Sequence, residues 1–246
     1  MFHPLDHPLD RGWVGRMDGD RAVHLAAQTL QSFFAGGSAA REHADYALGE
    51  VRLLAPVLEP PAVRDFDAFA RHAQPYFHFS NPASIFGPEA AVPYPEGAGE
   101  LDYELEVAAV IGAAGEIAGF TVMNDWSARD VQRHELSAGF GPGKAKDFAT
   151  SVGPVVVTID EFPGDEGELV ARVNGGERSR GNLRDLRASW EELRAHAARN
   201  TTLRPGDLLG SGGIDGTEPG DGRWLQRGDV VELEVEGIGV LRNTVA

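Results

Sequence analysis

Short apolar runs, separated by Gly, Pro and Asp, make up most of the chain after residue 63. Six of them have the length of strands: PYFHF, ELEVAAVIG, IAGFTVMN, VGPVVVTI, GELVARVNG and DVVELEVEGIG. Runs of this length bounded by turn residues are typical of β-strands. Many strands with few helices indicate closed or rolled sheets rather than a doubly wound fold. The pattern therefore predicts a β-rich α+β protein.

Helical periodicity is confined to a few segments. SWEELRAHAARN is predicted to be a helix because Ser189 and Glu192 form a capping box. A second helix is expected to begin near Ser127, whose hydroxyl can cap it. The apolar residues of VRDFDAFARHAQ, residues 63–74, recur at helical spacing, and this predicts a third helix.

The first part of the chain has the pattern of a small α+β module. RGWVGRMDGDRAVHLA predicts two short strands around a turn at Asp18–Asp20, and HLAAQTLQSFFAGG predicts a helix that ends at Gly36. VRLLAPV predicts one more strand. The proline-rich stretch LEPPAV, residues 58–63, is a plausible boundary. We therefore expect a small module over residues 1–57 and a catalytic domain over residues 58–246.

Composition narrows the classes of partner. The 246 residues carry a formal net charge of −16, which argues against binding to nucleic acid and to anionic membranes. There is no cysteine, so disulfides, thiolate ligands and cysteine nucleophiles are excluded. No signal peptide or membrane span is expected, because the start lacks an apolar core and the longest apolar run is well short of ~18 residues. We expect a soluble cytoplasmic protein, in which an anionic substrate needs local cations or a metal.

A pair of glutamates is the first candidate for chemistry. In LDYELEVAAVIG, Glu104 and Glu106 lie two apart, so a strand puts both on one face, with Tyr103 and Leu105 on the other. A solvated strand face is the ordinary explanation. However, the strand continues as VAAVIG, which looks buried, and a buried carboxylate pair is costly without a cation. The pair suggests a hard divalent ion, with Asp125 as its third ligand.

Polar residues follow Asp125 closely in GFTVMNDWSARDVQ. Arg129 and Gln132 lie three apart on the predicted helix and share a face, where they could meet a metal-bound substrate. The alternative is that Arg129 pairs with Asp130 or Glu135 on the surface. The glycine-rich segment GFGPGKAKDFATSVGP adds two lysines but lacks the Walker spacing. These lysines are candidates for contacts to substrate carboxylates.

Asp65 and His72 are seven residues apart, which is two turns of the predicted helix 63–74. They would therefore share a face. Asp65 could equally cap the helix and do nothing more, and a lone histidine such as His72 is more often structural than catalytic.

Together these stretches resemble the fumarylacetoacetate hydrolase family. The resemblance spans about residues 52–246 and is carried, in order, by VRDFDAFARH, LDYELEVAAVIG, GFTVMNDWSARDVQ, GKAKDFATSVGP, RPGDLLGSG and DVVELEVEGIGVLRN. It implies a core of rolled mixed β-sheets, usually as a homodimer, preceded by a small N-terminal domain. It also implies a divalent ion, Mg2+ first and Mn2+ or Ca2+ as alternatives, that binds a β-diketo or 2-oxo acid.

The resemblance assigns roles by position. It makes Lys144 the lysine near the metal and the leaving group, with Lys146 as an alternative. The implied set consists of the metal ligands Asp65, Glu104, Glu106 and Asp125, the catalytic residues His72 and Lys144, and the substrate-binding residues Arg129, Gln132 and Lys146.

The chain also departs from fumarylacetoacetase itself. Asp67 stands where that enzyme has a substrate-binding tyrosine, and Leu136 replaces another. Gly213 takes the place of a residue with a hydroxyl group. The glutamate that orients the histidine has no aligned partner in GIDGTEPGDGRW, where Glu218 is the one candidate. These departures put fumarylacetoacetate in doubt as the substrate but leave the metal ligands in place.

The function expected from the resemblance is metal-assisted hydrolysis of a carbon–carbon bond in a β-diketo acid, such as an acylpyruvate. In this scheme His72 activates water, and the metal and Lys144 stabilise the enolate that forms. A decarboxylase, isomerase or dehydratase would pass through the same metal-bound enolate. Two alternatives of another class are a non-catalytic protein that binds a metal or ligand, and a plain structural domain.

Overall fold

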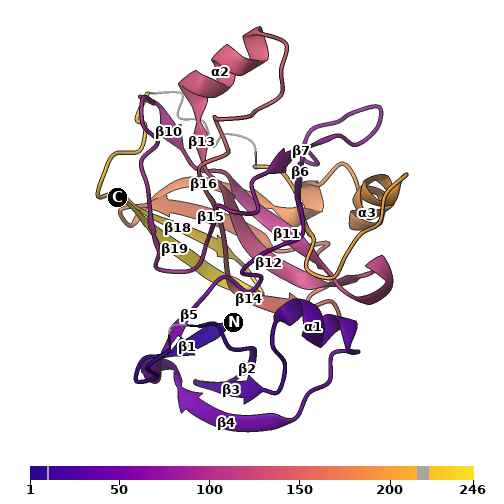
Figure 1. Cartoon of the computed structure of the whole chain (residues 1–246). Helices are drawn as coiled ribbons and strands as arrows, with labels where there is room; N and C mark the ends of the chain where they lie inside the picture. Colours follow the sequence, from indigo (N-terminus) through magenta and orange to yellow (C-terminus); the bar gives the residue numbers. More distant parts are fainter. Residues whose placement is uncertain (10, 215–221) are drawn as a thin grey trace.

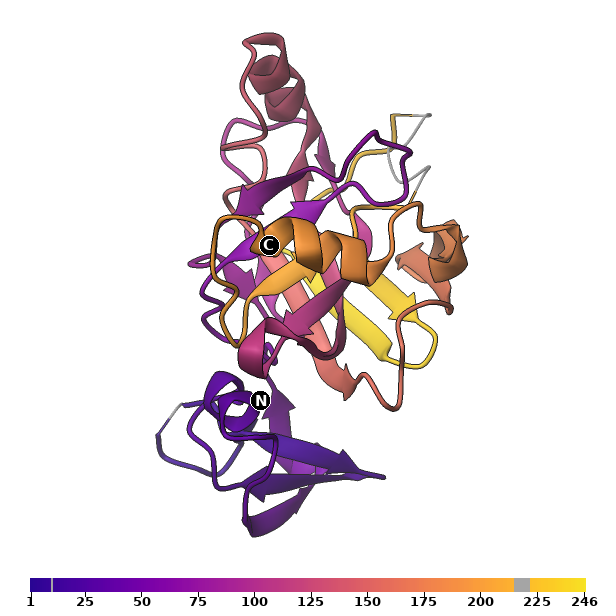
Figure 2. The same ribbon diagram turned by 90° about the vertical axis from the view of Figure 1, so that its right-hand side faces the viewer.

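The computed structural model describes residues 1–9, 11–214 and 222–246 (Figure 1). Two large β-sheets form the body of the molecule, and the N-terminal module lies at the opposite end from helix α2 in both views (Figures 1 and 2). Among the described residues, no helix has the length and apolar composition needed to cross a membrane.

The larger sheet has seven strands in the order β7-β6-β17-β11-β12-β14-β8. It is mixed, since β17 pairs with β6 and β14 pairs with β8 in parallel while the other pairs are antiparallel. Its strands are β6 (Val63–Phe66), β7 (Phe77–Ser80), β8 (Ile85–Phe86), β11 (Leu105–Ile111), β12 (Ile117–Asp125), β14 (Thr150–Thr158) and β17 (Leu208–Gly210).

The second large sheet has five strands in the order β16-β15-β18-β19-β9. They are β9 (Ala91–Val92), β15 (Glu168–Val173), β16 (Gly176–Asn182), β18 (Val230–Val235) and β19 (Gly239–Val245). Two short strands, β10 (Leu101–Asp102) and β13 (Ser127–Ala128), form a separate pair above the larger sheet (Figure 1).

The core lies between the two large sheets. Alternate residues of β11, Leu105, Val107 and Ala109, pack into one apolar cluster with residues of β15, β18 and β19. The residues between them point to the other face of the sheet, because successive side chains of a strand alternate. On that face Ala108 and Val110 join a second apolar cluster. This alternation confirms that Glu104 and Glu106 share a face, opposite Tyr103 and Leu105.

The N-terminal module packs on the second apolar cluster. It contains the sheet β2-β3-β4, the pair β1-β5 and helix α1. The predicted strands around the Asp18–Asp20 turn are confirmed, and Leu30 and Phe34 of α1 share the cluster with Ala108 and Val110. The bounds are β1 (Phe2–Pro4), β2 (Gly15–Asp18), β3 (Arg21–Leu25), α1 (Leu30–Ala35), β4 (Glu42–Ala47) and β5 (Val51–Leu53). The division at residues 57 and 58 stays a prediction.

Two helices belong to the body, α2 (Arg129–Ser137) and α3 (Trp190–Ala198). The capping box of α3 is confirmed, since Ser189 and Glu192 bond each other's backbone N–H groups. Helix α2 exists, but Ser127 does not cap it: the residue before the helix is Ala128, and the Ser127 hydroxyl donates to the backbone oxygen of Asp125. Short 3-10 turns cover Leu48–Glu50, Ala113–Gly115 and Leu183–Asp185.

The predicted helix over residues 63–74 is wrong. Val63–Phe66 form strand β6, which is buried throughout and lies between β7 and β17. Its charged residues are buried with partners, as Arg64 Nη1 lies 3.2 Å from Asp207 Oδ2. The helical spacing of apolar residues was therefore overridden by strand pairing with a distant part of the chain.

Candidate metal centre and pocket

Four carboxylates that the sequence separates meet on one face of the seven-stranded sheet. Asp65 comes from β6, Glu104 from the residue before β11, Glu106 from β11 and Asp125 from the end of β12. One oxygen from each lies within 4.8 Å of the others. The four predicted metal ligands are thus brought together. Asp65 reaches the cluster from a strand, so the alternative that it caps a helix is wrong.

A glycine gives these carboxylates room. Gly210 of β17 pairs with Asp65 of β6 on one side and Ala108 of β11 on the other. A Cβ atom at this position would lie 2.6 Å from Asp65 Oδ1 and 2.7 Å from Glu106 Oε2. Such distances are far inside van der Waals contact, so any other residue at Gly210 would displace the carboxylates.

The cluster has the properties of a cation site. Asp65 Oδ1, Glu106 Oε1 and Asp125 Oδ1 are buried and have no hydrogen-bond partner. Burial raises the pKa of Asp65 to about 7, against the attraction of His78. Burial, reinforced by the charge of Asp65, raises the pKa of Glu106 well above its ordinary value. Buried oxygens without donors are the ligands that hard divalent ions take, so these residues fit the metal that the sequence predicted.

The lysine in the cluster is Lys146, not Lys144. Lys146 is buried, and its Nζ lies 2.6 Å from Glu104 Oε2, 2.6 Å from Asp125 Oδ2 and 2.8 Å from Ser127 Oγ. Burial alone would raise the pKa of Asp125, but Lys146 and His78 outweigh it and hold that pKa below its ordinary value. The Lys144 side chain is 79% exposed and pairs with Asp147. The structure therefore gives the position beside the carboxylate cluster to the alternative lysine.

Arg129 is buried and supports the cluster. Its Nε and Nη2 donate to Asp102 Oδ2 at 2.9 and 2.7 Å, and its Nη1 donates to Glu104 Oε1 at 2.7 Å and Gln132 Oε1 at 3.1 Å. The alternative of a surface pair with Asp130 or Glu135 is thereby excluded. These bonds fix the direction of the Glu104 carboxylate, and Gln132 remains beside the pocket.

His78 is a site residue that the sequence reasoning missed. It lies on β7 directly opposite Asp65, and its Nε2 is 3.3 Å from Asp125 Oδ2 and 3.6 Å from Asp65 Oδ2. Burial lowers the pKa of His78, but Asp125 and Asp65 more than offset this and raise it. The alternation of PYFHF could have indicated a polar face shared by Tyr76 and His78, but the partner strand was not visible in the sequence.

His72 lies in the loop between β6 and β7 and is not part of the carboxylate cluster. Its Nε2 is 3.0 Å from Asp67 Oδ2, and its ring lies 4.5 Å from that of Tyr76. The helix that was to place it beside Asp65 does not exist. Its catalytic role stays a prediction.

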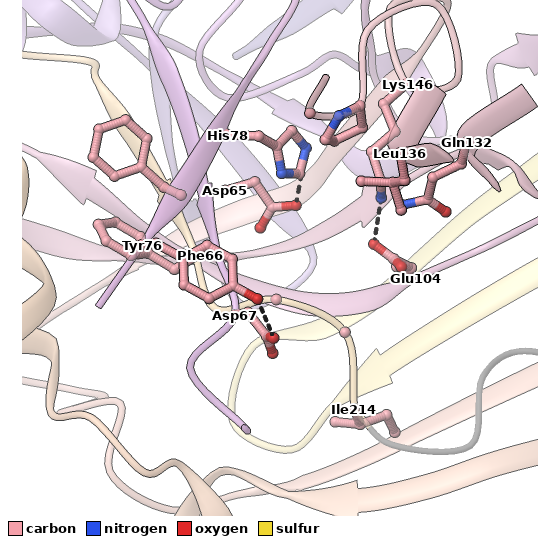
Figure 3. A pocket seen from close by; sticks show the side chains of 15 residues that line it. Asp65, Phe66, Asp67, Tyr76, His78, Glu104, Gln132, Leu136, Lys146 and Ile214 are labelled. Carbon is pink, nitrogen blue, oxygen red and sulfur yellow. Dashed lines mark hydrogen bonds and ion pairs between the residues drawn. The ribbon is translucent and has the colours of Figure 1, made fainter. Parts of the chain in front are cut away.

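A pocket of about 520 Å³ opens over the cluster (Figure 3). Asp65 and His78 lie together in its wall, Lys146 points to Glu104, and the Tyr76 hydroxyl points to Asp67 (Figure 3). The volume is within the usual range of small-molecule sites.

All three residues that depart from fumarylacetoacetase in the described part of the chain, Asp67, Leu136 and Gly213, line this pocket. Glu218 lies outside the described residues. Changes of residue type in the pocket wall alter what the pocket can hold.

Comparison with known proteins agrees with the fold. The family described as fumarylacetoacetate (FAA) hydrolase C-terminal matches residues 33–246. A mitochondrial oxaloacetate tautomerase of Homo sapiens is 32% identical over 80% of this chain and 70% of its own length. A mitochondrial oxaloacetate tautomerase of Xenopus laevis is 29% identical over 100% of this chain and 89% of its own.

Solved structures show the same fold. A 5-carboxymethyl-2-hydroxymuconate delta-isomerase of Mycobacterium smegmatis has a TM-score of 0.79 at 28% identity, over 95% of this chain and 94% of that one. A fumarylacetoacetate hydrolase of Exiguobacterium antarcticum has a TM-score of 0.82 at 27% identity, over 99% and 98%. The β-rich class with curled mixed sheets is confirmed. From the family match and the relatives together, the chain belongs to the fumarylacetoacetate hydrolase family.

Proposed function

We propose that this protein is a divalent-metal-dependent isomerase that interconverts the keto and enol forms of a 2-oxo acid. The observation that carries the proposal is the set of three buried carboxylate oxygens without hydrogen-bond partners, beside the charged Lys146 and under a pocket. Oxygen donors suit Mg2+ first, and also Mn2+ or Ca2+.

The charge of the site explains why a metal is needed. Five carboxyl groups, the four of the cluster and Asp102, lie around two permanent cations, Lys146 and Arg129. An anionic substrate would be repelled from such a pocket. A divalent ion would offset the excess negative charge and, when bound, would polarise adjacent keto and carboxylate oxygens as a Lewis acid.

Residues of the protein itself would stabilise charge, contact the substrate and transfer the proton. Burial alone would lower the pKa of Lys146, but the charges of Asp125 and Glu104 outweigh it and raise that pKa above its ordinary value. Lys146 therefore cannot serve as a base, but it can stabilise negative charge that develops on a substrate oxygen. Gln132 lines the pocket and offers an amide to a substrate oxygen. We assign the transfer of the proton at the carbon next to the keto group to His72.

The relatives support isomerisation over hydrolysis. Two similar proteins are oxaloacetate tautomerases, and one similar structure is a hydroxymuconate isomerase. Hydrolysis of a carbon–carbon bond is the second candidate, and the similarity to the hydrolase of Exiguobacterium antarcticum favours it. It needs water delivered to a substrate carbonyl in addition to a base. By family resemblance we further propose a homodimer, which light scattering would test.

A substrate panel tests the proposal. The purified protein with Mg2+ or Mn2+ should speed the decay of enol-oxaloacetate, followed by ultraviolet absorbance, and excess chelator should abolish the effect. Acylpyruvates and fumarylacetoacetate, followed by product analysis, report hydrolysis. Glu106→Gln should be inactive, whereas Lys144→Met, which changes an exposed lysine of the same region, should retain activity. Full activity in chelator would refute the metal role, and metal binding without turnover would favour a non-catalytic protein.

A further inference from the structure

A carboxylate in the pocket wall holds His72. Asp67 Oδ2 lies 3.0 Å from His72 Nε2 and accepts a second hydrogen bond, also 3.0 Å, from the Tyr76 hydroxyl. The rings of His72 and Tyr76 pack edge to face at 4.5 Å. Asp67 and Tyr76 both line the pocket. His72 is therefore fixed by one carboxylate and one ring at the rim of the site that contains the carboxylate cluster.

The backbone of Asp67 is itself tied to the sheet. Ala68 N donates to Ser211 O at 2.8 Å, directly beyond strand β17. Gly212 packs so closely on this segment that a Cβ there would lie 2.3 Å from Phe66 O and 3.0 Å from Asp67 Cα. The left-handed φ of +81° at Gly212 also favours glycine. The backbone of Asp67, at the start of the loop, is thus held rigidly in place. A residue that positions another side chain needs such rigidity.

The hydrogen bond also selects one tautomer of the imidazole. An ionised carboxylate can only accept hydrogen bonds, so His72 Nε2 must carry a proton and donate the hydrogen bond that Asp67 Oδ2 accepts. In the neutral ring the lone pair is then on Nδ1. We infer that Asp67 is the positioning residue of His72, which leaves Nδ1 as the atom that accepts the substrate proton. The glutamate that orients the histidine in fumarylacetoacetase has no aligned partner in this chain, and Asp67 takes over its role. This inference rests on the proposed function.

The pair of His72 and Asp67 is expected to contribute little to the stability of the fold. The side chains of His72 and Asp67 are 28% and 40% exposed. Ion pairs that accessible usually contribute only about 0–1 kcal/mol to stability. Replacing Asp67 should therefore leave the fold intact, and an effect on catalysis would report the position of the imidazole.

The first test needs no substrate. Nitrogen-15 spectra of the histidine rings, recorded at about pH 8.5 where free imidazole is neutral, should show His72 with its proton on Nε2. The signal is assigned by its loss in His72→Gln. In Asp67→Asn the tautomers should mix, and in Asp45→Asn, which breaks an exposed pair with Arg21 in the N-terminal module, the signal should not change. A proton mainly on Nδ1 of the wild-type ring would overturn the inference.

The second test is a double-mutant cycle on the metal-loaded enzyme. Asp67→Asn should lower kcat by about 10–100-fold with KM and metal affinity within about threefold, by analogy with the carboxylates that orient metal-binding histidines. In the His72→Gln background the same substitution should have no further effect. Additive losses, or a change in kcat below about twofold, would contradict the positioning role. If the wild type turns over no substrate in the panel, the proposed function fails, and the tautomer still decides the inference.

Discussion

Substitution of the two lysines of the GPGKAKD segment, Lys144 and Lys146, should have different effects on stability. Lys146 is buried with its Nζ 2.6 Å from both Glu104 and Asp125, whereas Lys144 is largely exposed. In Lys146→Met the metal-free protein keeps most of the side-chain volume but loses the cation. Breaking a buried ion pair by removing one partner typically costs about 3–5 kcal/mol. For a chain of this length that should lower Tm by roughly 6–20 °C.

The pH of the measurement sets the size of this effect. Burial alone would raise the pKa values of Glu104 and Asp125, but Lys146 outweighs it and holds both below their ordinary values. Stability from a depressed carboxyl pKa is present above the unfolded value of about 4 and is lost as the pH falls through the folded value. The loss in Lys146→Met should therefore be about as large at pH 4 as at pH 7, and it should shrink only as the pH falls further and the two carboxylates are protonated.

Urea denaturation in chelator at both pH values measures the loss. Lys144→Met is the matched control, since an exposed substitution in the same segment should change stability by less than about 0.5 kcal/mol. Mg2+ should restore part of the stability of Lys146→Met, because a divalent ion can replace the missing positive charge. If the two variants were destabilised equally, or Lys146→Met by less than about 1 kcal/mol, the assigned role of Lys146 would be wrong.

Three further outcomes test the carboxylate cluster. In chelator, Glu106→Gln should be as stable as the wild type or more stable in urea, because its buried carboxyl has a raised pKa and an unpaired oxygen, yet calorimetry should show lost metal binding. Metal affinity of the wild type should rise by at least about tenfold from pH 6 to pH 8, since Asp65 with a pKa of about 7, and Glu106 with a raised pKa, must release their protons to bind the ion; a flat profile would contradict this. Gly210→Ala should abolish metal binding, because its Cβ would collide with Asp65 and Glu106.

Local sequence patterns predicted those parts of the structure that depend on local rules. The alternation around Glu104 and Glu106 placed both on one face, and the capping box at Ser189 marked the start of α3. The carboxylate set came from family motifs and proved to be one cluster. In each case the deciding information is contained within a few neighbouring residues or in a motif.

The predictions that failed concern residues whose structure depends on partners far away in the sequence. Residues 63–66 have apolar spacing that suits a helix, but pairing with β17, more than 140 residues later, makes them a strand. His78 was missed because only the register of β6 and β7 puts it opposite Asp65. The choice between the two lysines depends on which side chain turns inward, and sequence spacing does not determine this.

The position of β17 has a consequence for how the protein matures. All four carboxylates precede residue 126, yet in the sheet formed by the described residues β17, which contains Gly210, lies between β6 and β11 and joins them. A nascent chain would therefore display every ligand before it could hold an ion. About 85 residues separate Asp125 from Gly210, so at ~5–20 residues per second the ribosome takes roughly 4–17 s to supply the joining strand. Metal binding would then become possible only after β17 has paired with β6 and β11. A chain truncated before residue 208 should therefore be unable to bind the ion.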